Sequence, residues 1–440
     1  MSLFTADADP GRPYWWDDIT WPDLTEDAPK EVDLLVIGGG YTGLSAAIAA
    51  HDAGAKVLVV DSGLPGEGAS TRNGGMLGAH PRLGWDVLAN RYGAASADAL
   101  FAEAGTALDW VKEMIAREGI ACDLEETGRI QLAYTSAHFD KQKSLAAKVS
   151  EKGGVPCQIL SRDDIAHEIE TPLYKGGILY PSHGALHPAK FLLGLLDAAM
   201  RRGIAVVGHC PVFKLARVQH KFQATTTQGL ITADKVVLAT NGYTGAPFPW
   251  VAARVFPVPS FLIATEPLAS DVIDELAPGR RIMVETRMFH SYFRASPDGT
   301  RILYGGRAAL VEIGLTKAAH RLHEKITGIW PQLRDTKISH VWTGSTGFTF
   351  GQMPHVGVRE GMHYALGYSG GGTVLAPWLG RKAALQALGL SAGETAFSAT
   401  KLQSRWFFKG GRPRFLQAAN LWYRHVVDPR EDRDSQAPLS

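Results

Sequence analysis

The first 61 residues contain two apolar runs separated by a segment with helical character. Residues 33–38 (DLLVIG) form a continuous apolar run that ends in glycine, which is the pattern of a buried parallel strand. Residues 42–55 (TGLSAAIAAHDAGA) predict a helix, and residues 56–61 (KVLVVD) predict a second strand that ends in an acid. A strand, a helix and a second strand in this order predict a parallel β-α-β unit, and therefore an α/β domain.

Three glycines stand where the first predicted strand meets the helix. Gly38, Gly40 and Gly43 have the spacing G-x-G-x-x-G. The first glycine permits a tight turn, the second lets a pyrophosphate approach the backbone, and the third allows the helix to pack closely on the strand. Free N–H groups at the helix N-terminus favour the phosphates, and Asp61 is placed to accept hydrogen bonds from an adenosine ribose. The unit predicts dinucleotide binding but does not separate NAD from FAD.

Three downstream segments favour FAD. Residues 66–76 (GEGASTRNGGM) predict a loop of small and polar residues that runs along the pyrophosphate towards the ring system. Residues 229–245 predict a hairpin strand, a polar turn and a buried strand, which return to the sheet with residues 204–212 near the adenosine. Residues 363–389 repeat the opening design of a strand, a glycine-rich turn and a helix. A helix N-terminus directed at N1–C2=O of a flavin stabilises the negative charge that builds there on reduction.

The composition argues against several other classes of protein. With 440 residues the chain is too long for one compact core, so we expect two or more folding units. A net charge of +1 gives no strong field that would attract nucleic acid. The three cysteines lie far apart and no H-E-x-x-H motif occurs, so we expect no metal site, no disulfide framework and a reducing compartment. The N-terminus lacks the pattern of a secretory signal and no 18-residue apolar run occurs, so we expect a cytoplasmic protein without a membrane span.

As a set, these motifs resemble those of a known family. The chain resembles the FAD-dependent amine and amino-acid oxidoreductases of the D-amino-acid oxidase superfamily, which includes glycine oxidase and sarcosine oxidase. Within that superfamily it is most similar to the γ-glutamylputrescine oxidoreductase branch. The resemblance covers nearly the whole chain and rests on the stretches PYWWDD (13–18), VIGGGYTGLSAA (36–47), GASTRNGG (68–75), HGALHPAKF (183–191), LATNGYTG (238–245), PVPSFLIATEPL (257–268), YGGR (304–307) and GYSGGG (367–372).

The resemblance implies an α/β FAD-binding Rossmann-like domain interwoven with an α+β substrate domain built on a mostly antiparallel sheet. The expected divisions are residues 29–85, 180–252 and 336–395 for the FAD-binding domain, 86–179 and 253–335 for the substrate domain, 1–28 for an N-terminal arm and 396–440 for a C-terminal tail. The sequence fits this division, because β-formers cluster in residues 257–268, 289–295 and 301–306. We expect the aromatic and basic tail to wrap the core and its last residues, 430–440, to be disordered.

The resemblance also implies which residues contact the cofactor. The expected FAD-binding residues are Gly38, Gly40, Tyr41, Thr42, Gly43, Asp61, Ser62, Ala69, Ser70, Thr71, Arg72, Asn73, Gly74, Gly75, Pro211, Val212, Thr240, Asn241, Gly242, Gly344, Gly370, Gly371, Gly372 and Thr373. No cysteine or histidine stands in the setting that marks covalent flavin in some relatives, so we expect noncovalent FAD.

The residues expected to act on the substrate are Arg307, His290, Tyr292, Arg72, Trp342 and Gln352. An arginine binds a carboxylate through two parallel hydrogen bonds, so we expect Arg307, or Arg294, either on an acidic group of the substrate or in a structural ion pair. His290 and Tyr292 alternate with outward positions on one predicted strand, so they share a face. Each of these two side chains either contacts the substrate amine or is an ordinary packed residue of the sheet.

The other three positions have alternatives too. Arg72 either balances charge near the flavin ring or makes an ordinary pyrophosphate or carbonyl contact. Trp342, with Phe348 and Gln352, either walls the cavity or belongs to the core. Relatives more often have an acid at the position of Gln352, and many have histidine at the position of Gly371. Because of these two differences, the resemblance does not identify the substrate.

The chemistry implied by the resemblance is oxidation of a C–N bond in an amine or amino acid. A hydride passes to flavin N5, and water hydrolyses the resulting imine. A γ-glutamylated or N-alkylated amine is the leading substrate class. Residues 301–306 lack the oxygen-activating lysine of sarcosine oxidases, so the electron acceptor is oxygen assisted otherwise, a quinone or a carrier protein. The alternatives are a D-amino-acid or cyclic imino-acid dehydrogenase, a tRNA-modifying flavoenzyme and a non-redox FAD-binding protein; homo-oligomer formation stays open.

Overall fold

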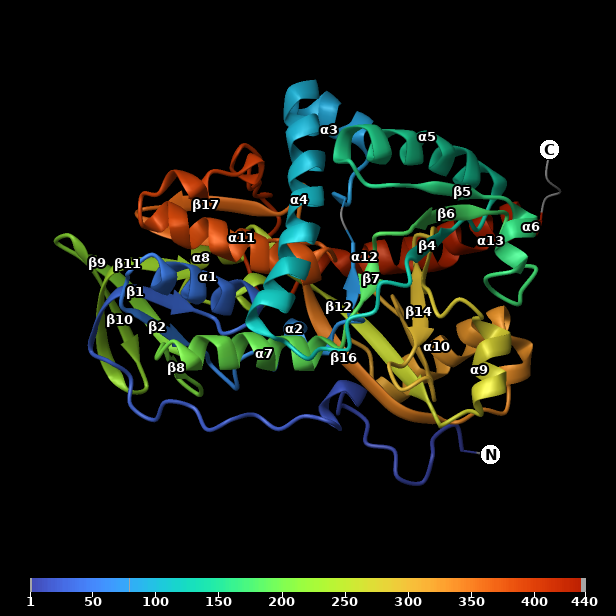
Figure 1. Ribbon diagram of the computed structural model, residues 1–440, viewed down its shortest axis with the longest axis horizontal. Helices are drawn as coiled ribbons and strands as arrows, with labels where there is room; N and C mark the ends of the chain where they lie inside the picture. The colour runs from blue at the N-terminus through green and yellow to red at the C-terminus, as the bar shows by residue number, and fades with distance from the viewer. Residues whose placement is uncertain (1, 79, 437–440) are drawn as a thin grey trace.

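The computed structural model of the protein describes residues 2–78 and 80–436, and within these residues two eight-stranded sheets lie next to each other along the long axis (Figure 1). The first sheet has the order β17-β18-β11-β1-β2-β8, and the β9–β10 hairpin joins it through β11. β1 lies between β11 and β2 and pairs parallel with both. Its strands are β1 (Glu31–Ile37), β2 (Val57–Val60), β8 (Ala205–Val207), β9 (Val212–Val218), β10 (Lys221–Thr226), β11 (Gly229–Leu238), β17 (His355–Arg359) and β18 (Met362–Leu366).

The second sheet has the order β16-β12-β15-β14-β13-β4-β6-β5, and only its β13–β4 pair is parallel within the described residues. Its strands are β4 (Arg129–Leu132), β5 (Gln158–Leu160), β6 (Gly177–Tyr180), β12 (Val255–Thr265), β13 (Ile282–Glu285), β14 (Ser291–Ala295), β15 (Ile302–Gly306) and β16 (Ile338–Thr349). A separate small ladder joins β3 (Met76–Leu77) and β7 (Gly184–Ala185). The chain passes from one sheet to the other and back, so the expected fold class is confirmed: a Rossmann-like portion is interwoven with a mostly antiparallel sheet.

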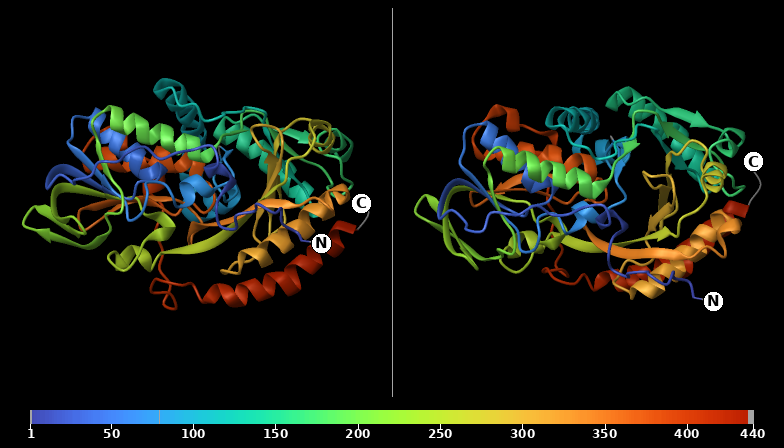
Figure 2. Two further views of the ribbon diagram at one scale, coloured as in Figure 1. Left: turned by 90° about the horizontal axis from the view of Figure 1, so that it is seen from below. Right: turned by 60° about the horizontal axis from the view of Figure 1, so that its bottom comes forward.

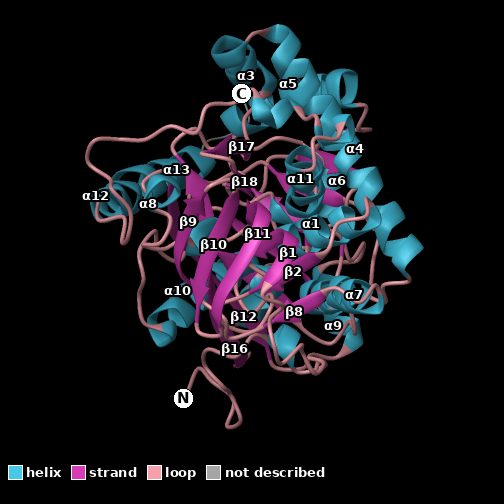
Figure 3. Cartoon of the chain, turned by 90° about the vertical axis from the view of Figure 1, so that its left-hand side faces the viewer, coloured by secondary structure: helices cyan, strands magenta, loops and turns pink. Residues whose placement is uncertain are grey.

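Each sheet has its own helices. Leu322 and Ile326 of α10 (Leu315–Ile329) are buried in one cluster with Ile263 and Tyr304 of the second sheet. The tail helices α12 (Phe415–Trp422) and α13 (Asp428–Gln436) run alongside α10 on the outside (Figure 2). On the first sheet, α1, α7 and α11 cover one face (Figure 3), and their bounds are Tyr41–Asp52, Pro188–Arg201 and Gly372–Ala387.

The remaining helices connect these layers. They are α2 (Ala69–Arg72), α3 (Trp85–Tyr92), α4 (Ala94–Glu118), α5 (Ser136–Gly153), α6 (Arg162–Ala166), α8 (Pro249–Ala252) and α9 (Ser270–Leu276), with the shorter turns η1 (Tyr14–Trp16), η2 (Asn241–Tyr243), η3 (Pro331–Leu333), η4 (Ser391–Gly393), η5 (Ala396–Ser398) and η6 (Tyr423–Val427). Leu100 and Phe101 of α4 are buried in the same core cluster as Leu44 of α1 and Leu379 of α11. The residue bounds proposed for the two domains stay a prediction.

The segment 229–245 differs from the prediction. We expected two strands and a polar turn, but β11 is one continuous strand, which pairs antiparallel with β10 in its first half and parallel with β1 further on. Ile231 and Ala233 are buried, whereas Thr232 and Asp234 between and beyond them are more exposed. The polar residues that suggested a turn are therefore the outward positions of an alternating strand.

The end of the tail also differs from the prediction of disorder. Residues 428–436 form α13, whose Asp432 accepts a hydrogen bond from Tyr134 Oη at 2.7 Å. Glu431 accepts a hydrogen bond from the backbone N–H of Met288 at 3.2 Å. These contacts with Tyr134 and Met288 hold a segment whose composition alone favours disorder. Residues 437–440 of the same prediction lie outside the described residues, as do Met1 of the arm and Ala79.

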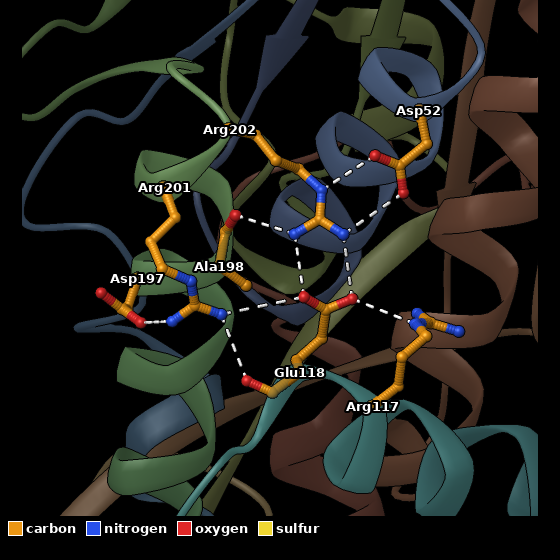
Figure 4. Close-up of polar contacts among 7 residues, drawn as sticks. All are labelled: Asp52, Arg117, Glu118, Asp197, Ala198, Arg201 and Arg202. Carbon is orange, nitrogen blue, oxygen red and sulfur yellow. Dashed lines mark hydrogen bonds and ion pairs between the residues drawn. The ribbon is translucent and has the colours of Figure 1, made fainter.

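Glu118 joins the ends of three helices that pack on the first sheet. Its carboxylate accepts hydrogen bonds from both terminal nitrogens of Arg202, at 2.8 and 3.0 Å (Figure 4). Arg202 also donates to Asp52, which ends α1, at 2.8 Å, and Arg201, which ends α7, lies 3.8 Å from the same glutamate. The Glu118 side chain is 6% exposed. Hydrogen bonding to Arg202 lowers the pKa of this carboxyl group.

We expect the substitution Glu118→Gln to lower the free energy of unfolding by about 1–3 kcal/mol at pH 7, because it removes a hydrogen-bonded charge from two guanidinium groups. The folded-state pKa lies below the unfolded value of about 4.3, so this stabilisation is present above the unfolded pKa and is lost as the pH falls through the folded one. Urea unfolding of both proteins across this pH range measures the difference, with the exposed Glu113→Gln on the same helix as control. A difference that does not change with pH would contradict the ion-pair account.

Candidate FAD-binding and active site

The first glycine turn brings α1 directly onto the end of β1. Gly38 has φ +107°, and a Cβ at this position would lie 2.9 Å from the carbonyl oxygen of Ala239 after β11. A Cβ on Gly43 would lie 1.8 Å from the carbonyl oxygen of Gly38. Gly40 is the N-cap of α1 and brings no side chain to cap the helix, although Ser70 Oγ of α2 accepts from the Tyr41 N–H that begins it. The turn therefore has the bare backbone that a diphosphate requires at a helix N-terminus.

Asp61 follows β2 at the same edge of the sheet. Its carboxylate accepts hydrogen bonds from the N–H groups of Gly39 at 2.6 Å and Gly63 at 3.0 Å, which fix its orientation beside the glycine turn. Burial raises the pKa of this carboxyl group. Its backbone carbonyl accepts a hydrogen bond from the N–H of Cys210 at 2.7 Å, which brings the predicted contacts Ser62, Pro211 and Val212 to the same edge.

Residues 69–72 form the short helix α2 instead of the predicted loop. Asn73 Nδ2 donates to the carbonyl oxygens of Ala69 and Ser70 at 3.1 and 2.9 Å, which satisfies the end of this helix. Ser70 Oγ accepts a hydrogen bond from the N–H of Tyr41 at 3.1 Å, so α2 touches the first turn of α1. The segment that follows, Gly74 and Gly75, leads directly into β3.

The second glycine turn resembles the first. Gly370 has φ +105°, and Gly371 is the N-cap of α11, again with no side-chain cap among the described residues. A Cβ on Gly370, Gly371 or Gly372 would make only ordinary van der Waals contacts, at 3.6 Å or more, with Arg82, Tyr368 or Leu375, so no described atom blocks the start of α11. Asn73 Oδ1 lies 3.5 Å from Thr373 Oγ1, and this contact places the end of α2 beside the first turn of α11.

α1 and α11 pack against each other and approach very closely at Thr42 and Gly380. A Cβ on Gly380 in α11 would lie 2.1 Å from the carbonyl oxygen of Thr42 in α1. Thr42 Oγ1 also lies 2.8 Å from Tyr368 Oη, just before the second glycine turn. The two open helix N-termini are therefore held in one rigid arrangement, with α2 between them. This arrangement fits an extended dinucleotide whose diphosphate lies at α1 and whose ring system lies at α11.

The turn after β11 lies next to the two glycine turns and contacts both sheets. Asn241 has φ +43° and its Oδ1 accepts a hydrogen bond from the N–H of Gly367, which follows β18, at 2.8 Å. A Cβ on Gly242 would lie 2.9 Å from the backbone N of Gly347 in β16. Thr240 Oγ1 lies 2.7 Å from Thr244 Oγ1 and closes the turn. The predicted contacts 240–242 thus lie between the ends of the parallel strands and the second sheet.

Tyr292 of β14 connects the second sheet with the segment that follows α2. Its ring lies between two glycines: a Cβ on Gly74 or on Gly305 would lie 2.8 or 2.2 Å from it. Its hydroxyl lies 3.0 Å from Ser260 Oγ. Burial raises the pKa of this hydroxyl to about 12, so it stays protonated at neutral pH.

Two arginines converge on one aromatic ring next to the second glycine turn. Arg307 follows β15 and Arg82 follows β3, and each guanidinium carbon lies 5.3 Å from the centre of the Phe348 ring. Arg82 donates to the carbonyl oxygen of Ser369 at 3.2 Å. Neither guanidinium has a carboxylate within 4.0 Å among the described residues. Burial, together with the nearby charge of Arg82, lowers the pKa of Arg307 to about 10. Two unpaired cations side by side are the electrostatic signature of an anion site.

His290 lies at the same place. Its ring centre is 6.5 Å from that of Tyr292, in agreement with the shared face expected from their spacing. Burial lowers the pKa of His290 far below its usual value, and the charges of Arg307 and Arg82 lower it further. The imidazole is therefore neutral at neutral pH.

Three other predicted residues have mainly structural contacts. The Arg72 guanidinium lies 4.4 Å from the centre of the Trp16 ring and donates to the Glu67 carbonyl oxygen at 2.7 Å, so it ties the N-terminal arm to α2. Trp342 is fully buried and donates from Nε1 to the Arg72 carbonyl oxygen at 2.9 Å; it belongs to the core and walls no open cavity. The same contact region includes Gly344, whose missing Cβ would lie 3.2 Å from the Arg72 side chain.

Arg294 and Gln352 do not join the pair of arginines. Arg294 is buried and forms an ion pair with Glu125 at 3.0 Å, which is the structural alternative considered for it. Gln352 is exposed in the turn between β16 and β17, with φ +57°. Sequence reasoning missed Arg82, because it belongs to no recognisable motif and only the folding of separate segments brings it to Arg307. Ser369 lies within the quoted stretch GYSGGG (367–372), but its setting there indicated no role of its own.

Comparison with known proteins agrees with this geometry. The sequence model of the FAD dependent oxidoreductase (DAO) family matches residues 33–386. The chain belongs to this family. It is 32% identical over 400 residues to the probable oxidoreductase OrdL of Rhizobium meliloti, covering 90% of this chain and 92% of the relative. It is 31% identical over 388 residues to the gamma-glutamylputrescine oxidoreductase of Escherichia coli, covering 86% and 88%.

Solved structures show the same fold. The glycine oxidase of Geobacillus kaustophilus superposes with a TM-score of 0.69 at 21% identity, covering 86% of this chain and all of that one. The L-proline dehydrogenase of P. horikoshii superposes with a TM-score of 0.69 at 18% identity, covering 89% and 99%. The cofactor of this DAO-family protein is FAD, as expected, and its noncovalent attachment stays a prediction. In residues 2–78 and 80–436, no helix is both long and apolar enough to cross a membrane.

We expect Gly380→Ala to weaken both the fold and FAD binding, because the new Cβ forces α11 away from the Thr42 carbonyl and displaces its N-terminus. Overpacking of this kind costs about 1–3 kcal/mol. Thermal unfolding and release of flavin on dilution measure the two effects. Gly314→Ala is the matched control, since a Cβ there meets no described atom within 4 Å. If Gly380→Ala kept the wild-type flavin affinity, the crossing would not be what positions the cofactor.

Proposed function

We propose that this protein uses FAD to oxidise a C–N bond in a small amine or amino acid that carries an acidic group. The observation that carries the proposal is the pair Arg82 and Arg307 beside the N-terminus of α11: both face the Phe348 ring, and neither has a carboxylate partner in the part of the chain that the structure describes. A carboxylate is the natural ligand of two such guanidinium groups. The acidic group of the substrate then lies next to the place where the flavin ring fits.

Relatives support the amine as the reacting group. The proteins most informative here are named for gamma-glutamylputrescine and for glycine, and both compounds contain an amine and a carboxylate. The identity to the E. coli oxidoreductase favours a modified amine such as a γ-glutamylated diamine. A D-amino acid or cyclic imino acid is the second candidate, because Arg82 and Arg307 suit an α-carboxylate equally well.

The chain's own residues orient the substrate and select its protonation state. FAD supplies the acceptor for the hydride. Arg82 and Arg307 bind the acidic group and repel a positively charged ammonium, so the reacting nitrogen is favoured as the neutral amine. His290 and Tyr292 carry no charge at neutral pH. Their lone pairs and the tyrosine O–H are available to hold the amine without opposing its deprotonation.

We expect an amine with an acidic group to bleach the flavin of the purified holoprotein under anaerobic conditions. The panel comprises γ-glutamylputrescine, putrescine, glycine, sarcosine, D-amino acids and L-proline. Loss of oxidised flavin absorbance identifies the substrate, and admission of oxygen or of a quinone then identifies the acceptor from the rate of reoxidation. If every compound left the flavin oxidised, the proposed oxidation would be wrong.

We expect Arg82→Gln and Arg307→Gln each to lower kcat/KM for the best acidic substrate by about 10- to 100-fold, because each removes a charge-assisted hydrogen bond. Stopped-flow flavin reduction at varied substrate concentration gives the rate and the apparent affinity separately. The control is Arg359→Gln, whose guanidinium pairs with Glu360 on the surface. Unchanged kinetics in Arg307→Gln would exclude a carboxylate clamp at this position.

A further inference from the structure

Residues 401–427 of the C-terminal tail, the basic segment, contain positive charges without negative ones. The segment has six lysines and arginines and no aspartate or glutamate, whereas the whole chain has a net charge of +1. The acids of the tail lie beyond it in α13, which has four acids and two arginines. Figure 2 shows α12 on the outside of the molecule, alongside α10. The basic segment therefore concentrates positive charge on one outer surface.

Acids do not neutralise this charge. In residues 2–78 and 80–436, only one cation of the basic segment has a carboxylate within 4.0 Å: Arg412 lies 3.9 Å from Glu312, and both side chains are largely exposed, so the pair is weak. Arg424 also lines a cavity between the tail and α10, together with Glu324 and Asp428. Exposed charges of one sign attract a partner of the opposite sign. The six exposed cations are Lys401, Arg405, Lys409, Arg412, Arg414 and Arg424.

The same segment exposes large apolar side chains. Trp406 is 85% exposed, Trp422 60% and Leu421 58%, and Phe407 and Val426 are exposed as well. These are five of the fourteen large apolar side chains that are exposed in the described part of the chain. Single exposed apolar residues are ordinary, but a cluster of them marks an interaction surface.

The aromatic side chains form one continuous strip. The ring centres of Trp406 and Phe407 are 5.6 Å apart, and those of Phe407 and Phe415 are 5.4 Å apart. Phe415 begins α12 and Trp422 ends it about 10 Å further along the axis, at a spacing of seven residues that places both on one face. Six of the eight residues of α12 are apolar, yet only Leu416 is buried.

The inner side of the tail is fixed to the rest of the protein. Phe408 and Leu416 are buried in one cluster with Phe256 of the second sheet. Asn420 Oδ1 accepts a hydrogen bond from the N–H of Leu310 at 2.9 Å. The packing of the inner side therefore holds the exposed strip in a defined position, so little ordering is needed when a partner binds.

A second copy of this chain is a poor partner for the strip. A twofold interface brings the same surface of two subunits together. Here it would place the six cations of one copy against the six of the other, and like charges in an interface oppose association. The partner is therefore anionic.

Among anionic partners, a membrane surface fits all parts of the segment. A nucleic acid suits the cations and the aromatic rings, but Leu421 and Val426 give it neither stacking nor hydrogen bonds. An anionic bilayer attracts the cations through its phosphates, accepts tryptophan rings at the level of its headgroups and accepts aliphatic side chains at the boundary of its acyl chains.

We propose that the basic segment docks this protein on the surface of an anionic membrane. Trp406 and Trp422 enter the headgroup layer, Leu421 lies at the acyl boundary, and the lysines and arginines contact lipid phosphates. The protein binds one face of the bilayer, so no helix has to cross it. This inference goes beyond the proposed oxidation and does not depend on it.

Cosedimentation of the holoprotein with vesicles tests the docking. One set of vesicles consists of phosphatidylcholine, and the other of phosphatidylcholine with phosphatidylglycerol. We expect the wild type to bind the anionic set at least tenfold more tightly at low salt. This preference should shrink as salt is added, because salt screens exposed charges. Absence of binding to the anionic vesicles would overturn the proposal.

A charge variant tests the cations of the basic segment. We expect Lys409→Gln/Arg414→Gln to weaken binding to the anionic vesicles at least tenfold at low salt. The matched control is Lys214→Gln/Lys235→Gln, which removes the same charge from exposed positions of the first sheet and should bind as the wild type does. An equal loss in both double variants would mean that net charge, and not this segment, attracts the vesicles.

An apolar variant tests the strip. We expect Trp406→Ser/Trp422→Ser to weaken binding to the anionic vesicles at least tenfold, and to do so at high salt as well, because insertion of apolar side chains is not screened. Its control is Phe213→Ser/Val358→Ser, at two exposed positions of the first sheet. Flavin absorbance and the unfolding temperature verify that the variants are folded. Wild-type binding by the tryptophan variant would contradict docking through the strip.

Two further outcomes would assign the surface to another partner. If sedimentation velocity finds a dimer that Trp406→Ser/Trp422→Ser converts to monomers, the strip is a contact between copies and the proposal is wrong. If polyglutamate or polyuridylate binds more tightly than the anionic vesicles at equal concentration of negative charge, the partner is an acidic protein or RNA and the proposal is wrong. None of these measurements involves flavin reduction, so the docking and the oxidation stand or fail separately.

Discussion

The contact between α1 and α11 at Thr42 and Gly380 is the constraint on which the cofactor site depends. A carbonyl oxygen occupies the space that any side chain on Gly380 would need. Close packing fixes both the distance between the helices and the direction of their N-termini, since a well-packed crossing resists sliding and rotation. In the expected binding mode each N-terminus faces one end of FAD, so a shift at the crossing would change both ends of the site together.

A similar close contact holds the second sheet against the segment that follows α2. Tyr292 fits between Gly74 of this segment and Gly305 of the neighbouring strand β15, with no room for a larger residue at either position. Glycine loses more backbone entropy on folding than other residues, but its missing Cβ lets the tyrosine ring approach the backbone closely. The result is a defined position for β14 and β15, and therefore for His290 and Arg307, relative to the start of α11.

The charged residues near the expected flavin position differ from those under the C-terminal tail. At the expected flavin position, uncharged His290 and Tyr292 lie beside the guanidinium groups of Arg82 and Arg307, whereas the cavity under the tail is lined by five cationic side chains together with Glu324, Asp428 and Asp432. Uncompensated charges of this kind destabilise a fold, so they persist where a ligand neutralises them. By contrast, the three acids Glu118, Asp52 and Asp197 are neutralised by three arginines, and this cluster holds helix ends together; the arginines are Arg117, Arg201 and Arg202.

The amino-acid sequence by itself determined the β-α-β unit at 31–60, both glycine turns and the helices that follow them, because these features arise from local periodicity and from backbone conformations that only glycine adopts readily. It misjudged the polar middle of β11 and the charged end of the tail, where pairing with distant strands and side chains overrides local preference. Only the tertiary structure decided that Arg82 joins Arg307, that Arg72 and Trp342 support the scaffold, and that the tail encloses a cavity against α10. The physical reason is that charge pairing and cavity walls depend on contacts between segments hundreds of residues apart, which no local pattern encodes.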